Sequence, residues 1–195
     1  MLTLYHAPNS RSTSVVQLLH ELGITDQVTV REVTIPRQDG TGGRDPANPH
    51  PEGKVPYLTD GNDHVRERGA IILYLADRFP AEGIGRPVGD PQRGALLSWL
   101  FWYQGVFEPL AILHWAGIDH PAISASLRDF DTAIRRLDEV LSRQPYLLGA
   151  GFSAADLLCA APFAWFGDRL PAPPAIRDWA ARCQDRPSVR AVGER

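Results

Sequence analysis

The chain has 195 residues, 44% of them hydrophobic, which is enough for one full domain or two small ones with separate cores. Its 20 Lys and Arg residues against 23 Asp and Glu residues give a net charge of −3. Proteins that bind nucleic acid or anionic membranes usually carry a basic excess. We therefore expect small molecules or proteins as partners, and neither nucleic acid nor a membrane.

The two cysteines, Cys159 and Cys183, are too far apart for a Cys-x-x-Cys motif. This spacing argues against a disulfide scaffold and a structural zinc site, and the six histidines show no metal-ligand spacing. No secretory signal pattern and no apolar run of membrane-spanning length is found. We expect a cytoplasmic protein without a metal.

The N-terminal third has a β-α-β pattern. Residues 2–5 are a predicted strand, residues 6–12 a loop, and residues 28–35 a second strand. The helix between the strands has an apolar face made by Val15, Leu18, Leu19 and Leu22. A β-α-β unit predicts parallel strands joined by a right-handed crossover. Residues 36–51 are rich in Gly, Pro, Asp and Asn and are predicted to be a loop.

A predicted hairpin and helix follow this loop. Residues 55–59 are β-prone and contain Pro56, and the Asp60-Gly61 pair is a turn signal before a returning strand at residues 65–66. From Arg68, apolar residues recur at helical spacing until Pro80. Residues 1–79 therefore predict a mixed four-stranded sheet with helices.

The remainder is predicted to be helical. Residues 80–90 form a linker, and the first helix runs from Pro91 to about Trp115 with a kink at Pro109. A second, single helix is marked by one apolar stripe comprising Ile123, Leu127, Phe130, Ile134, Leu137 and Leu141.

The third helix is predicted to start at a capping box, Ser153 with Asp156. Residues 157–166 contain hardly any polar side chain, which is typical of a helix buried on all sides. A fourth helix begins at Pro173-Pro174, and one more short turn follows Pro187.

The order of these elements and their motifs resembles the cytosolic glutathione transferases, of bacterial type. The motifs are Asn48-Pro49 before Gly53-Lys54-Val55-Pro56, Glu67 with Ala70-Ile71 and Tyr74-Leu75, and Phe152-Ser153-Ala-Ala-Asp156. Each is weak alone, but their order and spacing over nearly the whole chain are specific. The resemblance implies an α/β thioredoxin-like N-terminal domain (β-α-β-α/loop-β-β-α) at residues 1–79, a linker at 80–90, and an all-α C-terminal helical bundle at 91–195.

The resemblance also implies how glutathione is held. The Val55–Pro56 peptide bond would be cis, and Val55 backbone groups would pair with the cysteinyl part. Lys54 would meet the glycyl carboxylate. Glu67 and the helix N-terminus that follows it would bind the γ-glutamyl end. The family usually has serine where this chain has Arg68, whose side chain would either add a contact to the same carboxylate or extend into solvent.

The group that activates the thiol is expected in the loop before the first helix. Ser10 stands where serine-type members carry their catalytic hydroxyl, and such a donor would lower the pKa of the bound thiol. Tyr5 and Ser12 are the rivals. Ser10 is alternatively an N-cap, and a box of Ser14 with Gln17 would start the helix slightly later. Because no cysteine lies there, the serine type is favoured over the cysteine type.

Five side chains of the first long helix are either an apolar substrate pocket or bundle core. They are Trp102, Tyr103, Phe107, His114 and Trp115. For any one of them, aromatic residues at helical spacing favour core.

The leading hypothesis is a homodimeric, detoxifying glutathione transferase that adds the glutathione thiolate, as co-substrate, to an apolar electrophile. One alternative is a non-catalytic transferase-like regulatory or binding protein, since a fold does not determine function. The other is a glutathione-dependent isomerase or dehalogenase.

Overall fold

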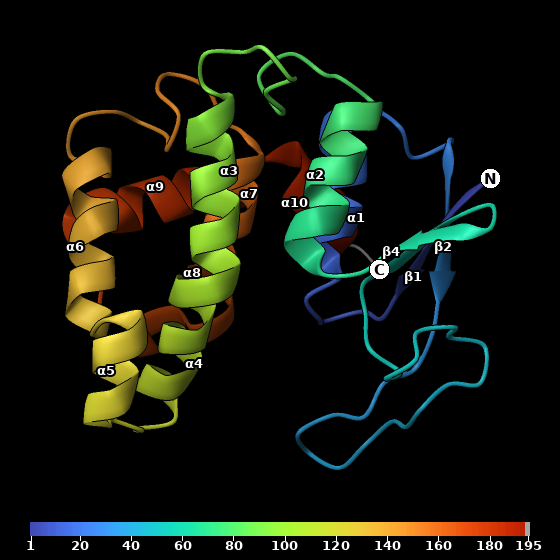
Figure 1. Ribbon diagram of the computed structural model, residues 1–195, viewed down its shortest axis with the longest axis horizontal. Helices are drawn as coiled ribbons and strands as arrows, with labels where there is room; N and C mark the ends of the chain where they lie inside the picture. The colour runs from blue at the N-terminus through green and yellow to red at the C-terminus, as the bar shows by residue number, and fades with distance from the viewer. Residues whose placement is uncertain (194–195) are drawn as a thin grey trace. The chain divides into compact units, whose positions relative to one another are not determined.

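The computed structural model describes residues 1–193, which divide into two compact units (Figure 1). The first unit contains Met1–Ala81 together with the C-terminal helix α10 (Pro187–Gly193), and the second unit is Glu82–Arg186. Helix α10 packs against the first helix of the chain, and Ser188 Oγ donates a hydrogen bond of 2.5 Å to Glu21 Oε1. The segment after Pro187, which the sequence assigned to the helical domain, therefore groups with the sheet.

The sheet of the first unit has four strands in the order β2-β1-β3-β4. They are β1 (Leu2–His6), β2 (Val28–Glu32), β3 (Tyr57–Asp60) and β4 (Asp63–Val65). β1 pairs in parallel with β2 and antiparallel with β3, and β3 pairs antiparallel with β4. The predicted mixed four-stranded sheet and its hairpin are confirmed. The predicted limits of three strands were wrong by up to three residues. β2 ends at Glu32, β3 begins only after Pro56, and β4 begins at Asp63, two residues before the predicted returning strand.

Two helices cover the sheet, α1 (Thr13–Leu22) and α2 (Arg68–Arg78), and they pack against each other (Figure 1). Their apolar faces are buried, including Leu18, Leu19 and Ile71 at 0% exposure. Burial of each such side chain contributes about 1.5–3 kcal/mol, which is why the periodicity alone predicted both helices correctly.

The predicted capping of α1 was wrong. The helix begins at Thr13, with Ser12 in the N-cap position, and no side chain caps it. Ser14 lies inside the first turn, where its hydroxyl donates to Arg11 O at 2.9 Å and cannot start a later helix. The serines that precede this helix are engaged elsewhere, as described below.

The second unit is helical throughout. Its elements are α3 (Arg93–Trp102), a π-helical turn η1 (Tyr103–Phe107), α4 (Glu108–Trp115), α5 (Pro121–Leu127), α6 (Phe130–Leu141), α7 (Ala154–Cys159), α8 (Ala161–Phe166), a 3-10 turn η2 (Gly167–Arg169) and α9 (Pro174–Gln184).

The predicted first long helix is continuous from α3 to α4, with its irregularity in the turn before Pro109. Proline lacks the N–H that would bond to the carbonyl of Gly105, and its ring crowds that carbonyl, so the preceding turn widens into a π-helix. By length and composition, Arg93–Trp115 would also pass as a membrane span. One face of it forms the core of the bundle, including Leu96, Leu100 and Phe107.

Two predicted helices are each divided. The apolar stripe from Ile123 to Leu141 spans α5 and α6, because Arg128 has φ 86 and Asp129 caps α6 by accepting a 2.6 Å hydrogen bond from Thr132 N. The predicted third helix breaks at Ala160, two residues before Pro162, which has no N–H to donate. Only its first half, α7, is buried throughout, and Trp165 in α8 is 63% exposed.

The capping box at the start of α7 is confirmed, and its carboxylate organises the core of the second unit. Asp156 is fully buried and accepts four hydrogen bonds, from Leu147 N (2.8 Å), Ser153 N (2.9 Å), Ser153 Oγ (2.7 Å) and Trp179 Nε1 (2.9 Å). Burial raises the pKa of this carboxyl above its ordinary value, although the four hydrogen bonds that it accepts act to lower the pKa. One side chain thus joins α7, α9 and the loop at Leu147.

Candidate active site

Strand pairing brings the predicted site segments to one end of the sheet. Because β1 and β3 are antiparallel and Tyr5 faces Tyr57, the chain leaving β1 lies beside the chain entering β3. Val65 faces Leu58, so the chain leaving β4 toward α2 reaches the same end. His6 faces Glu32 across the parallel pair, so β2 also ends there. Three connecting segments, at residues 7–12, 33–56 and 66–67, therefore meet in one place.

The loop from Ala7 to Ser12 is held together by its own hydroxyl groups. Ser10 Oγ donates to Ala7 O at 2.7 Å, and it lies 2.7 Å from Ser12 Oγ. Ser12 N donates to Ser10 Oγ at 3.1 Å, and Ala7 N donates to Ser12 Oγ at 3.1 Å. Ser10 is half-buried, whereas Ser12 is fully buried. Of the two serines, only Ser10 is partly exposed to solvent.

His6 lies behind these two serines. Its Nδ1 atom is 2.7 Å from Ser12 Oγ, and its side chain is buried at the end of β1. The His6 carbonyl accepts a 2.8 Å hydrogen bond from Val33 N, which fixes the backbone there. The contacts form one continuous chain from the histidine ring to the hydroxyl of Ser10.

Arg37, in the loop after β2, holds the outer side of this serine loop. Its guanidinium group donates to Pro8 O at 2.7 Å and to Asn9 O at 2.8 Å. Asn9 has φ 53, a left-handed conformation that asparagine tolerates better than most residues do. The clamp thus fixes the strained residue that immediately precedes Ser10.

The Val55–Pro56 peptide bond is cis, which is the isomer that the resemblance implies. Val55 is half-buried and precedes the ladder, whose first pair on β3 is Tyr57 with Tyr5. Asn48 supports this segment, since its Nδ2 atom donates to Lys54 O at 3.1 Å. The Lys54 side chain is exposed.

His50 orders the turn that leads into this segment. It accepts a 3.0 Å hydrogen bond from Glu52 N at Nδ1, and its ring packs edge-on against Tyr57 at a centroid distance of 5.2 Å. Burial lowers the pKa of His50 below 6.5, which favours the neutral ring that this acceptor role requires.

Glu67 and Arg68 lie where the chain enters α2. Glu67 is exposed and has φ 69, a conformation rarely adopted by a residue other than glycine, and it is the N-cap residue of the helix. Arg68, in the first turn, is only 5% exposed. The alternative in which Arg68 extends into solvent was therefore wrong. Arg68 is thus a buried residue in the first turn of α2.

The two rivals of Ser10 differ in their surroundings. Ser12 is enclosed by the contacts described above. Tyr5 lies within β1, with its ring 6.1 Å from that of Tyr57 and with the guanidinium carbon of Arg31 5.9 Å from its centroid. Ser12 is thus fully buried at the N-cap of α1, and Tyr5 lies in a strand and not in the loop before α1.

Three of the five aromatic candidates lie in the core of the second unit. Trp102, Tyr103 and Phe107 are at most 5% exposed, and Trp102 stacks on Phe107 at 5.0 Å. His114 is exposed and stacks on Phe130, with centroids 4.1 Å apart. Trp115 is 38% exposed.

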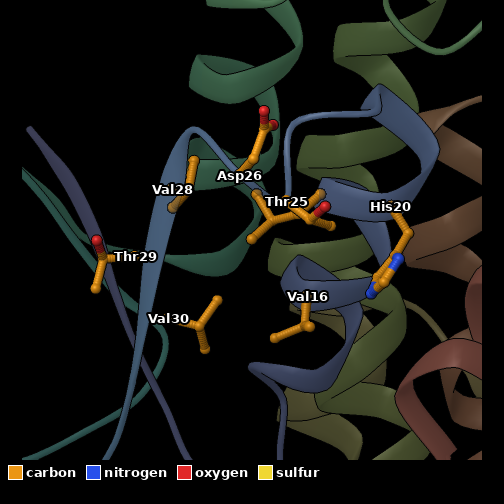
Figure 2. A pocket seen from close by; sticks show the side chains of 8 residues that line it. Val16, His20, Thr25, Asp26, Val28, Thr29 and Val30 are labelled. Atoms are coloured by element: carbon orange, nitrogen blue, oxygen red, sulfur yellow. The ribbon is translucent and has the colours of Figure 1, made fainter.

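A hollow on the first unit lies elsewhere, between α1 and the edge strand β2 (Figure 2). It has a volume of about 360 Å³, and its lining includes Val16, His20, Asp26 and Val30. None of the candidate residues borders it. The hollow is separate from the end of the sheet where the candidate residues meet, so we assign it no role in the chemistry. Among residues 1–193, no three His, Cys, Asp or Glu side chains are grouped as metal ligands.

Comparison with known proteins gives the family. Residues 4–83 match the model of the glutathione S-transferase N-terminal domain, and residues 120–191 match that of the C-terminal domain. Glutathione S-transferase 1 of Schizosaccharomyces pombe is 32% identical over 165 residues, which are 78% of this chain and 69% of that protein. The chain belongs to the glutathione S-transferase family.

Other members of the family resemble the chain over its whole length. The disulfide-bond oxidoreductase YfcG of Escherichia coli is 27% identical over 97% of this chain and 93% of its own. A sphingomonad glutathione S-transferase solved in complex with glutathione is 25% identical with a TM-score of 0.76, over 98% of this chain and 97% of that one. The thioredoxin-like sheet and the helical bundle predicted from the sequence are thus those of this family.

Sequence reasoning missed His6 and Arg37. His6 is one of six scattered histidines, and Arg37 lies in a loop without periodicity, so no pattern indicated either. The available signal was the position of His6 at an inward-facing strand position directly before the serine loop.

Proposed function

We propose that the protein is a glutathione transferase in which the hydroxyl of Ser10 stabilises the glutathione thiolate. The observation that carries this proposal is the half-buried Ser10 hydroxyl at the start of α1, where two groups of Ser12 approach its oxygen. With its oxygen occupied in this way, Ser10 has its single hydrogen to donate.

In the proposed reaction, the thiol of glutathione releases its proton to solvent, and the sulfur attacks an apolar electrophile. The new bond joins the sulfur to a carbon of the substrate. In a substitution the leaving group departs with the electron pair of the broken bond, and in an addition the substrate takes up a proton. A hydrogen bond to a charged group contributes about 1.5–3 kcal/mol, which corresponds to a decrease of about one to two units in a thiol pKa of about 8.5. The N-terminus of α1 adds to this stabilisation.

The remaining groups at this end of the sheet are proposed to hold the peptide. Val55 precedes the cis-Pro56 and is outside the strand ladder, so its backbone suits the cysteinyl part of glutathione. The start of α2, with Arg68 beside it, suits the γ-glutamyl carboxylate, and the exposed Lys54 suits the glycyl carboxylate. Glu67 is proposed to meet the ammonium group. The sphingomonad relative was solved in complex with glutathione, which supports glutathione as the ligand.

The apolar co-substrate is proposed to meet the exposed aromatic side chains of α4, Trp115 and His114. Trp102, Tyr103 and Phe107 are assigned to the core, because they are buried, with Trp102 stacked on Phe107 and Tyr103 edge-on against it. A homodimer and a role in detoxification remain part of the proposal.

Replacement of Ser10 by alanine tests the proposal. We expect the pKa of the bound thiol to rise by one to two units and kcat/KM near neutral pH to fall by about 10- to 100-fold, because one unit of pKa is a factor of ten in thiolate. Ser142→Ala, on the exposed surface after α6, is the matched control. An unchanged pH–rate profile for Ser10→Ala would transfer the role to Tyr5 or Ser12.

A second candidate function is the reduction of disulfides by glutathione, which the E. coli relative favours. Cys159 and Cys183 are both buried in the second unit, so the thiols would come from glutathione. Two glutathione molecules would give two protons and two electrons to the substrate disulfide, yielding glutathione disulfide and two thiols. Parallel assays with an aryl halide and with a small dialkyl disulfide distinguish this candidate from conjugation. Isomerisation and dehalogenation are tested in the same panel, and binding without any turnover would favour the non-catalytic role.

A further inference from the structure

We infer that His6 and Ser12 are positioning residues that fix the direction in which the Ser10 hydroxyl donates. This inference rests on the proposed function, since it concerns the same hydroxyl. His6, Ser12 and Ser10 form a hydrogen-bonded series with two successive separations of 2.7 Å, and its two inner members are buried.

The direction of this series follows from its outer end. The carbonyl of Ala7 can only accept, and it lies 2.7 Å from Ser10 Oγ and 3.3 Å from Ser12 Oγ. We assign the hydrogen of Ser10 to this carbonyl, because its contact is the shorter of the two. The short contact between the two serines then requires Ser12 to donate to Ser10. With the hydrogen of Ser12 used in this way, the contact with His6 requires the ring to donate from Nδ1.

This assignment fills the acceptor positions of both hydroxyl groups. Ser12 Oγ accepts from His6 Nδ1 and from Ala7 N, and Ser10 Oγ accepts from Ser12 Oγ and Ser12 N. A hydroxyl oxygen has two lone pairs, so neither oxygen has room for a further donor. Ser10 can therefore meet a ligand only as a donor, which is the role that a thiolate requires.

A thiolate placed beside Ser10 would compete with the Ala7 carbonyl for that one hydrogen, and only the O–H bond of Ser10 has to rotate. The rest of the series is buried and already oriented. Hydrogen bonds in series polarise one another, so donation from His6 strengthens donation by Ser10. The fully buried Ser12 connects the two.

The test compares two substitutions of similar size at His6. In His6→Asn the side-chain amide places an N–H near the position of Nδ1, whereas His6→Leu fills the space without a donor. We expect His6→Leu to raise the pKa of bound glutathione, measured by thiolate absorbance, and to lower kcat/KM below that pKa by about three- to tenfold. His6→Asn is expected to restore most of the loss. Ser12→Ala should behave like His6→Leu.

A purely structural role would lower activity without moving the thiol pKa, so an unchanged pKa in His6→Leu would overturn the inference. The same substitution made in the Ser10→Ala background should have no further effect on the pKa, because the group that it orients is gone. A further rise there would also contradict the inference. If Ser10→Ala itself leaves the pKa unchanged, the proposed function fails. If Ser10→Ala raises the pKa and His6→Leu does not, only the inference fails.

Discussion

Removal of the Arg37 clamp should slow the reaction without unfolding the protein. Arg37→Met keeps much of the aliphatic length of the side chain and deletes both hydrogen bonds, to Pro8 O and to Asn9 O. These bonds hold the backbone on the N-terminal side of Ser10. Arg37→Lys keeps the charge but loses the planar fork that reaches both carbonyls.

The magnitude follows from the two bonds and from the strain that they oppose. A hydrogen bond from a charged donor contributes about 1.5–3 kcal/mol, and exposure to solvent reduces this, so we take about 1 kcal/mol for each. The left-handed Asn9, at φ 53, costs about 1–2 kcal/mol and favours other loop conformations once the clamp is lost. If the ordered conformation of the loop is destabilised by about 2 kcal/mol, the ratio of ordered to disordered loop falls by roughly 30-fold.

Steady-state kinetics and hydrogen exchange measure this effect together. We expect kcat/KM for glutathione to fall by about 5- to 30-fold in Arg37→Met and by less in Arg37→Lys. Exchange at the Ser12 amide should accelerate, while the urea midpoint should match that of the exposed control Arg143→Met. Faster exchange with unchanged kcat/KM would refute the reasoning, because the ordered loop would then not be needed for catalysis.

The remaining predictions concern stability. Asp156→Asn replaces an acceptor facing the Ser153 amide by a donor, and should lower the free energy of unfolding, measured with urea, by about 2–3 kcal/mol. The exposed control Asp178→Asn should lower it by less than about 0.5 kcal/mol. Equal urea midpoints for the two variants would show that the buried carboxylate is not needed for stability. His50 has a pKa lowered by burial, so the folded state binds fewer protons than the unfolded state. The stability that the neutral His50 ring contributes to the folded state is fully present above pH 6.5, and it is lost as the pH falls from 6.5 toward the lowered pKa. Because an asparagine oxygen can replace Nδ1 as the acceptor for Glu52 N, His50→Asn should flatten this part of the stability–pH curve, and an unchanged slope would contradict the assignment.

Hydrophobic periodicity predicted α1 and α2 because each of these helices buries one face. The predicted mixed sheet did not include the antiparallel contact between β1 and β3, which brings the serine loop beside Pro56. Periodicity did not predict where α5 and α6 separate. Their apolar stripe is continuous, and the break depends on the capping of α6 by Asp129. Local side-chain hydrogen bonds of this kind compete with helix formation and leave the stripe unchanged.

The candidate site was predicted only as far as motifs extend. Val55, Pro56 and Glu67 lie in recognisable motifs. In the structure the Val55–Pro56 peptide bond is cis, and Glu67 has a positive φ. The support for Ser10 was not predictable in the same way. His6, Ser12 and Arg37 act through loop geometry, and their contacts span between 2 and 29 residues in sequence without any period. The buried position of Arg68 likewise depended on packing around α2 and not on its own sequence neighbours.

Titration of the purified protein with glutathione, followed by calorimetry and by thiolate absorbance, tests the central claim most directly. The account predicts saturable binding below millimolar concentration and a bound thiol with a pKa at least one unit below its usual value of about 8.5. Absence of binding at millimolar glutathione, or a bound thiol with an unshifted pKa, would contradict it.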